Sequence, residues 1–403
     1  MNLGGLSLLQ APPFLIVFGF FSTAIAFGTA ASFLELYFSL EVALNLPILV
    51  HLYTLGFALF SMFGALFQML PVVAGAVIEN PKPKALLSYT LLILGVPFML
   101  LGFSKGALLI PGALITYAGI LYTSLLMLFH LMKIKVYTPT PKGFRYSLTF
   151  LMLGATLGLY TVLSYGGLVP YLEKAILIHF TLLLFGWIGL LIASVSFQVV
   201  EMFFVTEAYK RKFSMSFPLL VSVGMLLSVF DRLFALFLSL TFLVYSFMTL
   251  KRLVKRRRRS PDYTLYFWYL SQAFLIASST LFPFIEYAFY PFLFSNLVFF
   301  SSMIMGMMYR IMPFLVWFHL SNKLAKDVPL MSDVIPSKRI KMSLYLHALW
   351  VCAMGFSFLL KLGYTIASCI HIASFLLLFY NVLRSGMLYF KLSRRGQSFF
   401  NHI

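Results

Sequence analysis

Long runs of apolar residues, separated by short polar segments, define the organisation of this chain. A run of about 20 apolar residues is long enough to cross the hydrocarbon core of a bilayer as a helix. Twelve such runs can be placed, and they predict twelve transmembrane helices. The predicted spans are residues 13–34, 50–78, 86–103, 108–133, 146–168, 172–204, 216–230, 233–250, 263–285, 291–320, 343–361 and 364–390.

Two long apolar runs are each divided into a pair of spans. Residues 213–250 would form a helix of about 57 Å, which is much longer than the roughly 30 Å hydrocarbon core. A tight turn at Asp231-Arg232 gives two short spans instead. Residues 343–390 divide in the same way at residues 361–363.

Composition supports the same class of protein. Of the 403 residues, 61% are apolar and only 10% are charged, whereas soluble domains carry about 25% charged residues. We therefore predict an all-α polytopic membrane protein whose single transmembrane domain covers residues 1–403. Two cysteines exclude a disulfide framework, and the chain has no phosphate-binding glycine loop and no haem-attachment motif.

The formal net charge of +19 is concentrated in alternate loops. This asymmetry follows the positive-inside rule, and it predicts that both termini lie in the cytoplasm of a cell whose inner membrane holds the chain. Because the basic residues lie in short loops between apolar spans, the charge indicates topology and not a nucleic-acid partner. The first span lacks a basic n-region and a cleavage site, so it is interpreted as a retained helix.

A short motif recurs in three of the predicted spans. It consists of a small residue, then an aromatic residue and a polar residue, and it ends on Pro or Glu. The copies begin at Gly64, Ser194 and Gly306, at intervals of four spans. Gly56 and Gly186 share the spacing of the first two copies. The pattern predicts three four-helix arcs, at about residues 13–133, 146–250 and 263–390.

Two histidine-containing segments of the chain stand out. The first is His51-Leu-Tyr-Thr-Leu-Gly56 with Gly64-Ala-Leu-Phe67-Gln68 and Pro71-Val-Val-Ala-Gly75-Ala, and the second is His179-Phe-Thr-Leu-Leu-Leu-Phe-Gly186-Trp. They resemble the catalytic subunit of the haem-copper oxidases and nitric oxide reductases, and the NnrS-type membrane proteins are similar in layout. In that family a His at the outer end of the second helix ligates haem, and a His of the sixth helix ligates copper.

The chain also departs from that family. The seventh helix of the family carries a His pair and the tenth carries His-x-His, but residues 213–230 and 291–296 contain no His. A binuclear haem-copper centre needs those ligands. The resemblance therefore implies a related protein that is not a complete oxidase or nitric oxide reductase.

The resemblance implies that His51 and His179 bind a cofactor, either one b-type haem or a metal such as copper. His179 and, without support from a family motif, His371 are candidate metal ligands. The implied roles are electron transport, response to nitric oxide or a metal, or cofactor maturation. The implied partners are the lipid bilayer and a redox partner or respiratory complex.

A polar layer is predicted near the inner ends of the second, sixth and tenth spans. Its members are Gln68, Gln198, Glu201 and Arg310, which occupy matching positions of the repeated motif. An isolated charge inside a membrane is costly, so we expect Glu201 and Arg310 to form an ion pair.

Two other functions remain open from the residues alone. Twelve spans are typical of secondary transporters, although such proteins usually have two repeats of five or six helices. A structural subunit of a respiratory complex, without any cofactor, is the other alternative.

Overall fold

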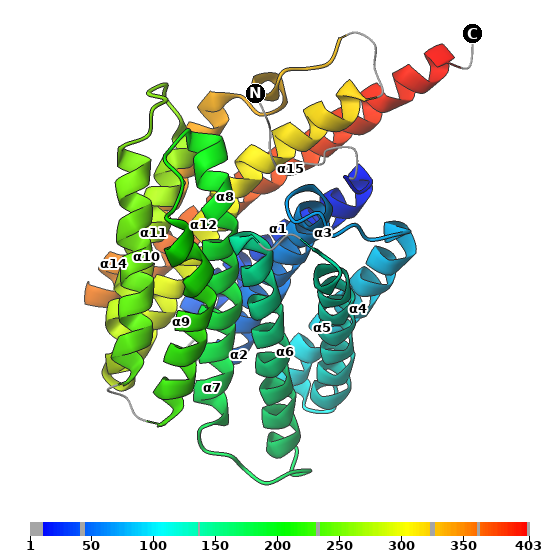
Figure 1. The fold of residues 1–403 in the computed structure, drawn as a ribbon. Helices are drawn as coiled ribbons and strands as arrows, with labels where there is room; N and C mark the ends of the chain where they lie inside the picture. The colour runs from blue at the N-terminus through cyan, green and yellow to red at the C-terminus, as the bar shows by residue number, and fades with distance from the viewer. Residues whose placement is uncertain are drawn as a thin grey trace. The chain divides into compact units, whose positions relative to one another are not determined.

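The computed structural model describes residues 11–40, 45–135, 138–230, 234–322, 327–360 and 363–400. Every regular element in these ranges is a helix (Figure 1). The elements are α1 (Phe14–Leu40), α2 (Leu46–His51), η2 (Leu52–Leu59), α3 (Phe60–Val72), α4 (Pro81–Lys105), α5 (Leu109–Met132), α6 (Pro139–Tyr165), α7 (Ala175–Thr181), η3 (Leu182–Gly189), α8 (Leu190–Phe204), α9 (Arg211–Phe230), α10 (Ala235–Val254), α11 (Tyr263–Leu281), η5 (Phe282–Phe284), α12 (Ile285–Ser321), α13 (Met331–Val334), α14 (Ser337–Leu360) and α15 (Tyr364–Phe400).

The helices agree with a multi-pass membrane protein. Ten helical stretches of the described residues are long and apolar enough to cross a membrane, and one of them, Tyr263–Ser321, contains both α11 and α12. Each predicted span overlaps a helix or a set of joined helices, and α14 is the counterpart of the predicted span 343–361. The predicted turn at Asp231-Arg232 lies outside the described residues, as do residues 361–362 of the second predicted turn.

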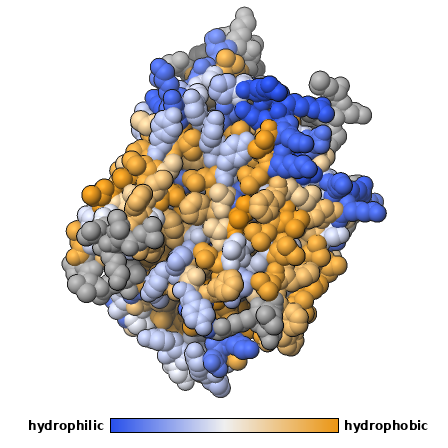
Figure 2. Space-filling view, turned by 90° about the vertical axis from the view of Figure 1, so that its left-hand side faces the viewer, coloured by the Kyte–Doolittle hydropathy of each residue, from blue (hydrophilic) through white to orange (hydrophobic). Residues whose placement is uncertain are grey.

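The surface of the helices is rich in exposed apolar side chains. On α4, Leu87, Leu94, Phe98 and Leu101 are all exposed, and their spacing of seven, four and three residues places them on one face. Figure 2 shows apolar residues over most of the visible face of the protein. Soluble monomers rarely expose large continuous apolar patches, so this surface suits contact with lipid.

The described residues form two compact units, which are treated separately below. The first unit contains residues 1–12, 66–260 and 269–300. Within it, α4 and α5 form a closely packed antiparallel pair (Figure 1). A Cβ atom on Gly112 would lie only 2.2 Å from the backbone nitrogen of Met99, and one on Gly102 only 2.3 Å from the Cα of Leu109. Glycine is therefore what permits these backbones to approach.

The second unit contains residues 13–65, 261–268 and 301–403. Within it, α1 packs against η2 and α15, and α14 also packs against α15. Gly28 of α1 lies against the ring of Phe375, and Gly56 of η2 lies against Phe27. These contacts join the first and last long helices of the chain, and they position the polar side chains described next.

Two helical stretches are π-helical in their middle. The π segments are η2 and η3, which begin at Leu52 and Leu182 and end at Leu59 and Gly189, so that both ends differ by 130 residues. Gly56 and Gly186, the pair noted in the sequence, lie inside them. π-helical turns are rare and are frequent at functional sites, and both segments come directly after a stretch that contains a candidate ligand His.

Candidate functional site

His179 is seated on a glycine face of α6. Its Nδ1 donates a hydrogen bond of 2.8 Å to the carbonyl oxygen of Gly154. A Cβ atom on Gly158 would lie 2.6 Å from the Cε1 atom of the same ring, so glycine at this position leaves room for the imidazole. Gly154 and Gly158 thus pack within the chain, against α7 and the start of η3.

His51 is anchored in a similar way by its own helix. Its Nδ1 lies 2.8 Å from the carbonyl oxygen of Pro47, one turn earlier, and donates to it. The residue is half-buried and directly precedes η2. In both His51 and His179, therefore, Nδ1 carries the proton, which leaves Nε2 as the nitrogen with the metal-binding lone pair.

Neither of these two imidazoles is part of a chelate site among the described residues. A ligating His usually donates its other ring N–H to a carbonyl or carboxylate, which fixes the ring and its tautomer. No group of three His, Cys, Asp or Glu side chains that could hold a metal ion is found among the described residues. Since His51 and His179 belong to different units, each is considered as a ligand by itself.

His371, the third candidate, lies in a buried polar cluster of the second unit. Its Nδ1 is 2.7 Å from Oε2 of Glu35, and the hydroxyl of Tyr53 is 3.2 Å from the same nitrogen. The His371 side chain is fully buried, and Glu35 is only 8% exposed. The cluster therefore joins α1, η2 and α15 through one imidazole.

Aromatic rings enclose the other side of this imidazole. The indole of Trp350 stacks on His371 with a centroid distance of 3.6 Å and an interplanar angle of 9°. The ring of His347 lies 5.2 Å from the same indole, and its Nε2 is 2.9 Å from Oγ of Ser302. Nε2 of His371 and Nδ1 of His347 are both buried without a hydrogen-bond partner.

Sequence reasoning missed most of this cluster. It placed Glu35 in a loop after a span that ends at residue 34, whereas α1 continues to Leu40 and carries Glu35 into the packed interior. His347, which is fully buried ten positions into α14, was not selected as a candidate. An acidic residue directly after an apolar run, with no helix-ending residue behind it, was the available signal.

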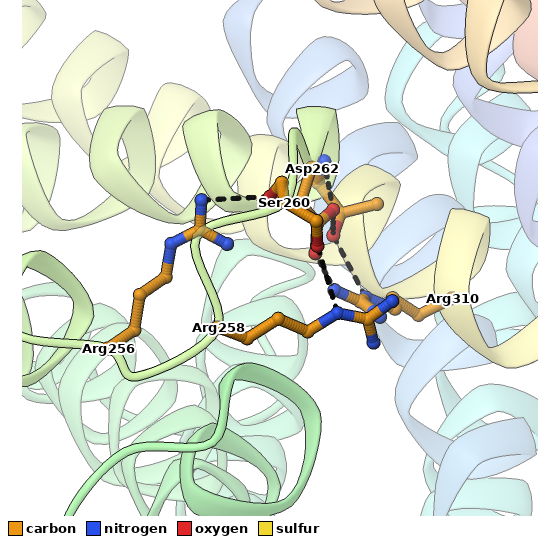
Figure 3. Close-up of polar contacts among 6 residues, drawn as sticks. Arg256, Arg258, Ser260, Asp262 and Arg310 are labelled. Atoms are coloured by element: carbon orange, nitrogen blue, oxygen red, sulfur yellow. Dashed lines mark hydrogen bonds and ion pairs between the residues drawn. The ribbon is translucent and has the colours of Figure 1, made fainter.

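The residues of the predicted inner polar layer belong to both units, and Arg310 lies in the second. Within that unit Arg310 has an acidic partner, Asp262, which directly precedes α11 (Figure 3). Nε of Arg310 also donates to Oγ1 of Thr264 over 2.9 Å. The expected pair with Glu201, a residue of the first unit, stays a prediction.

The other members of that layer belong to the first unit. Gln68 is buried, and neither polar atom of its side chain has a partner; Gln198 is half-buried and Glu201 is exposed. Within the same unit, the basic segment after α10 is ordered by Ser260 (Figure 3). Arg258 donates to the Ser260 hydroxyl over 2.9 Å, and Arg256 donates to its carbonyl oxygen over 3.1 Å.

Comparison with known families and curated proteins gives no match: no family model matches the chain, and no curated protein matches it.

Proposed function

We propose that this chain is a multi-pass membrane protein with the architecture of the haem-copper oxidase catalytic subunit, and that it holds one b-type haem through a histidine. The observation that carries the proposal is the matched surroundings of His51 and His179. Each ring is anchored through Nδ1 to a backbone carbonyl, and each residue lies just before a π segment. The two histidines are 128 residues apart and the two π segments 130.

A recurring contact supports the proposed three-arc architecture. The three small residues that begin the sequence motif each pack against the preceding long helix. Gly64 lies against Phe20 of α1, Ser194 against Gly143 of α6, and Gly306 against Phe267 of α11. The positions on the preceding helices are 123 and 124 residues apart, so one pairwise contact recurs three times along the chain.

Each candidate residue has one role in this proposal. His51 would hold the haem iron through Nε2, and His179 is the second candidate to do so. The carbonyl groups of Pro47 and Gly154 hold the two rings in orientation. A bound b-type haem would supply one-electron transfer or gas binding, which suits a role beside a redox partner in the inner membrane.

Full oxidase chemistry is not part of the proposal. The segments 213–230 and 291–296 lack the His residues that a binuclear centre requires. His371 is also left out, since no further ligand-type side chains complete a metal site around it among the described residues. Copper at His179 remains a secondary version of the proposal, and it requires ligands from outside this set.

The absorption spectrum of the detergent-purified chain tests the proposal. We expect a Soret band and a reducible α-band with about one iron per chain. His51→Ala should abolish the bands; if His179 is the ligand instead, His179→Ala abolishes them. His402→Ala should retain them in either case. Copper is assayed on the same samples. Protein from haem-sufficient cells that lacks both haem and metal would refute the proposal.

A proton-coupled secondary transporter is the second candidate function. The observation that favours it is the buried carboxylate–imidazole contact between Glu35 and His371. Ionisable residues inside membranes commonly belong to ion pathways or proton relays in transporters.

A further inference from the structure

We propose that Glu35 and His371 form a buried site that binds one exchangeable proton at Nε2 of His371, and that Trp350 stabilises the protonated ring. This inference uses contacts within the second unit alone, and it does not depend on a haem at His51 or His179. The ligand class is the proton itself, held inside a membrane protein away from bulk water.

The short hydrogen bond between Glu35 and His371 indicates which ring nitrogen of His371 carries the proton. Glu35 Oε2 and His371 Nδ1 are 2.7 Å apart. With Glu35 ionised, its carboxylate can only accept, so Nδ1 of His371 carries a proton and donates it. In this state, with a neutral imidazole, the pair has a net charge of −1, and the lone pair of the ring lies on Nε2.

The Nε2 lone pair of His371 lies in the protein interior. Nε2 is fully buried, and no group among the described residues forms a hydrogen bond with it. One added proton binds there, forms an N–H bond and converts the ring to imidazolium, so the charge of the pair changes from −1 to zero. A neutral pair is much less costly in a low-dielectric interior than a single carboxylate, and this difference drives proton binding.

The indole of Trp350 stacks on the His371 ring and favours its protonated form. An imidazolium over an aromatic face gains a cation–π interaction, and Trp is the strongest partner for it. The His371 and Trp350 rings are nearly parallel at 3.6 Å, so adding the proton to His371 strengthens this contact. Trp350 therefore favours the same protonation state as Glu35.

The groups around His371 include no competing cation among the described residues. Glu35 faces the imidazole from α1, Tyr53 from η2, and Phe375 from its own helix. From α14 come Trp350 and, on the far part of the same indole, His347. His347 is the one other basic group of the cluster, and its neutral form accepts from or donates to Ser302.

Fluorescence of Trp350 tests the proposal, because an imidazolium in van der Waals contact quenches indole emission and a neutral imidazole quenches it much less. The chain has four Trp residues, so changing the other three to Phe leaves Trp350 as the reporter. These substitutions are Trp187→Phe, Trp268→Phe and Trp317→Phe. We expect the emission of the detergent-solubilised chain to rise on alkalinisation with a single-proton transition.

Two variants assign the transition to the pair. Glu35→Gln removes the negative charge and should move the midpoint to lower pH by roughly one to three units. His371→Gln should remove the transition. His347→Gln is the matched control, since it changes a second imidazole beside the same indole and should retain a transition that still responds to Glu35→Gln.

Two results would overturn the proposal. One is Trp350 emission that does not change between pH 4 and 10 while circular dichroism shows an intact helical fold. A permanently paired structural contact would give this result. The other is a midpoint that Glu35→Gln leaves in place. If a variant does not fold, infrared difference spectra of the unsubstituted chain must show loss of a ring-protonated histidine signal across the same transition, or the proposal fails.

The outcome is separable from that of the haem proposal. The midpoint, and not the absolute intensity, is the measured quantity, so quenching by a bound haem does not alter the conclusion. A chain without haem can retain the proton transition, and a haem-containing chain can lack it.

Discussion

Gly158→Ala tests whether the glycine face of α6 exists to seat His179. The added methyl carbon would lie 2.6 Å from Cε1 and 2.9 Å from Nδ1 of the imidazole. Ordinary contact begins near 3.4 Å, so the ring must move by about 0.8 Å or the helices must separate. Either movement disturbs the 2.8 Å hydrogen bond from Nδ1 to Gly154.

The expected cost can be assembled from two terms. Overpacking of a close contact costs about 1–3 kcal/mol, and the weakened hydrogen bond adds about 1 kcal/mol. Alanine also gains roughly 0.5–1 kcal/mol over glycine inside a helix. The net expectation is a loss of roughly 1–3 kcal/mol in the free energy of unfolding.

Gly355→Ala is the matched control, because this glycine also lies inside a helix and its Cβ would meet no atom within 4 Å. It should gain the helix propensity without any clash. The assay is SDS-driven unfolding of the detergent-solubilised variants, followed by circular dichroism. If Gly158→Ala is as stable as Gly355→Ala, the packing argument for His179 is refuted. Under the haem proposal, Gly158→Ala should also shift the Soret band when His179 is the ligand.

Three further substitutions probe single contacts. Gly112→Ala places a methyl group against the backbone of Met99, a clash that no rotamer change can relieve. It should destabilise the chain in the same unfolding assay by at least as much as Gly158→Ala, and a neutral effect would contradict the α4–α5 packing. Asp262→Asn should cost about 1 kcal/mol, because the pair with Arg310 is partly exposed. Glu201→Gln, at an exposed residue, should cost less than Asp262→Asn, and the reverse order would make Glu201 the stronger partner of Arg310.

The helices were predictable from the sequence because lipid imposes a strong one-dimensional pattern. Each apolar run of about 20 residues leaves few alternatives to a spanning helix. The π segments η2 and η3 were not predictable in the same way. A π turn changes the hydrogen-bond partner of the backbone without changing hydropathy, so Leu52–Leu59 looks like any other apolar stretch.

The candidate site was predictable only in part. His51 and His179 were selected through the family resemblance, and His371 was added because ionisable groups in apolar spans are unusual. Their partners could not be selected, since Pro47 and Gly154 contribute backbone oxygens that no side-chain pattern reveals. Asp262 lay in a loop by hydropathy, and only the packing of α11 beside α12 brings it to Arg310.

The bond between Glu35 and His371 has a consequence for how this protein is made. The two residues are 336 positions apart, and translation at about 5–20 residues per second separates their synthesis by roughly 20–70 s. During that interval the first helix must enter the membrane with a carboxyl group whose partner does not yet exist. An acidic residue at a helix centre costs about 2.5–3.5 kcal/mol on the insertion scale. Glu35 lies close to the end of α1 at Leu40, so its cost is smaller, and the Phe- and Ala-rich remainder of α1 has to outweigh it. Glu35 gains its buried partner only when α15 has been made.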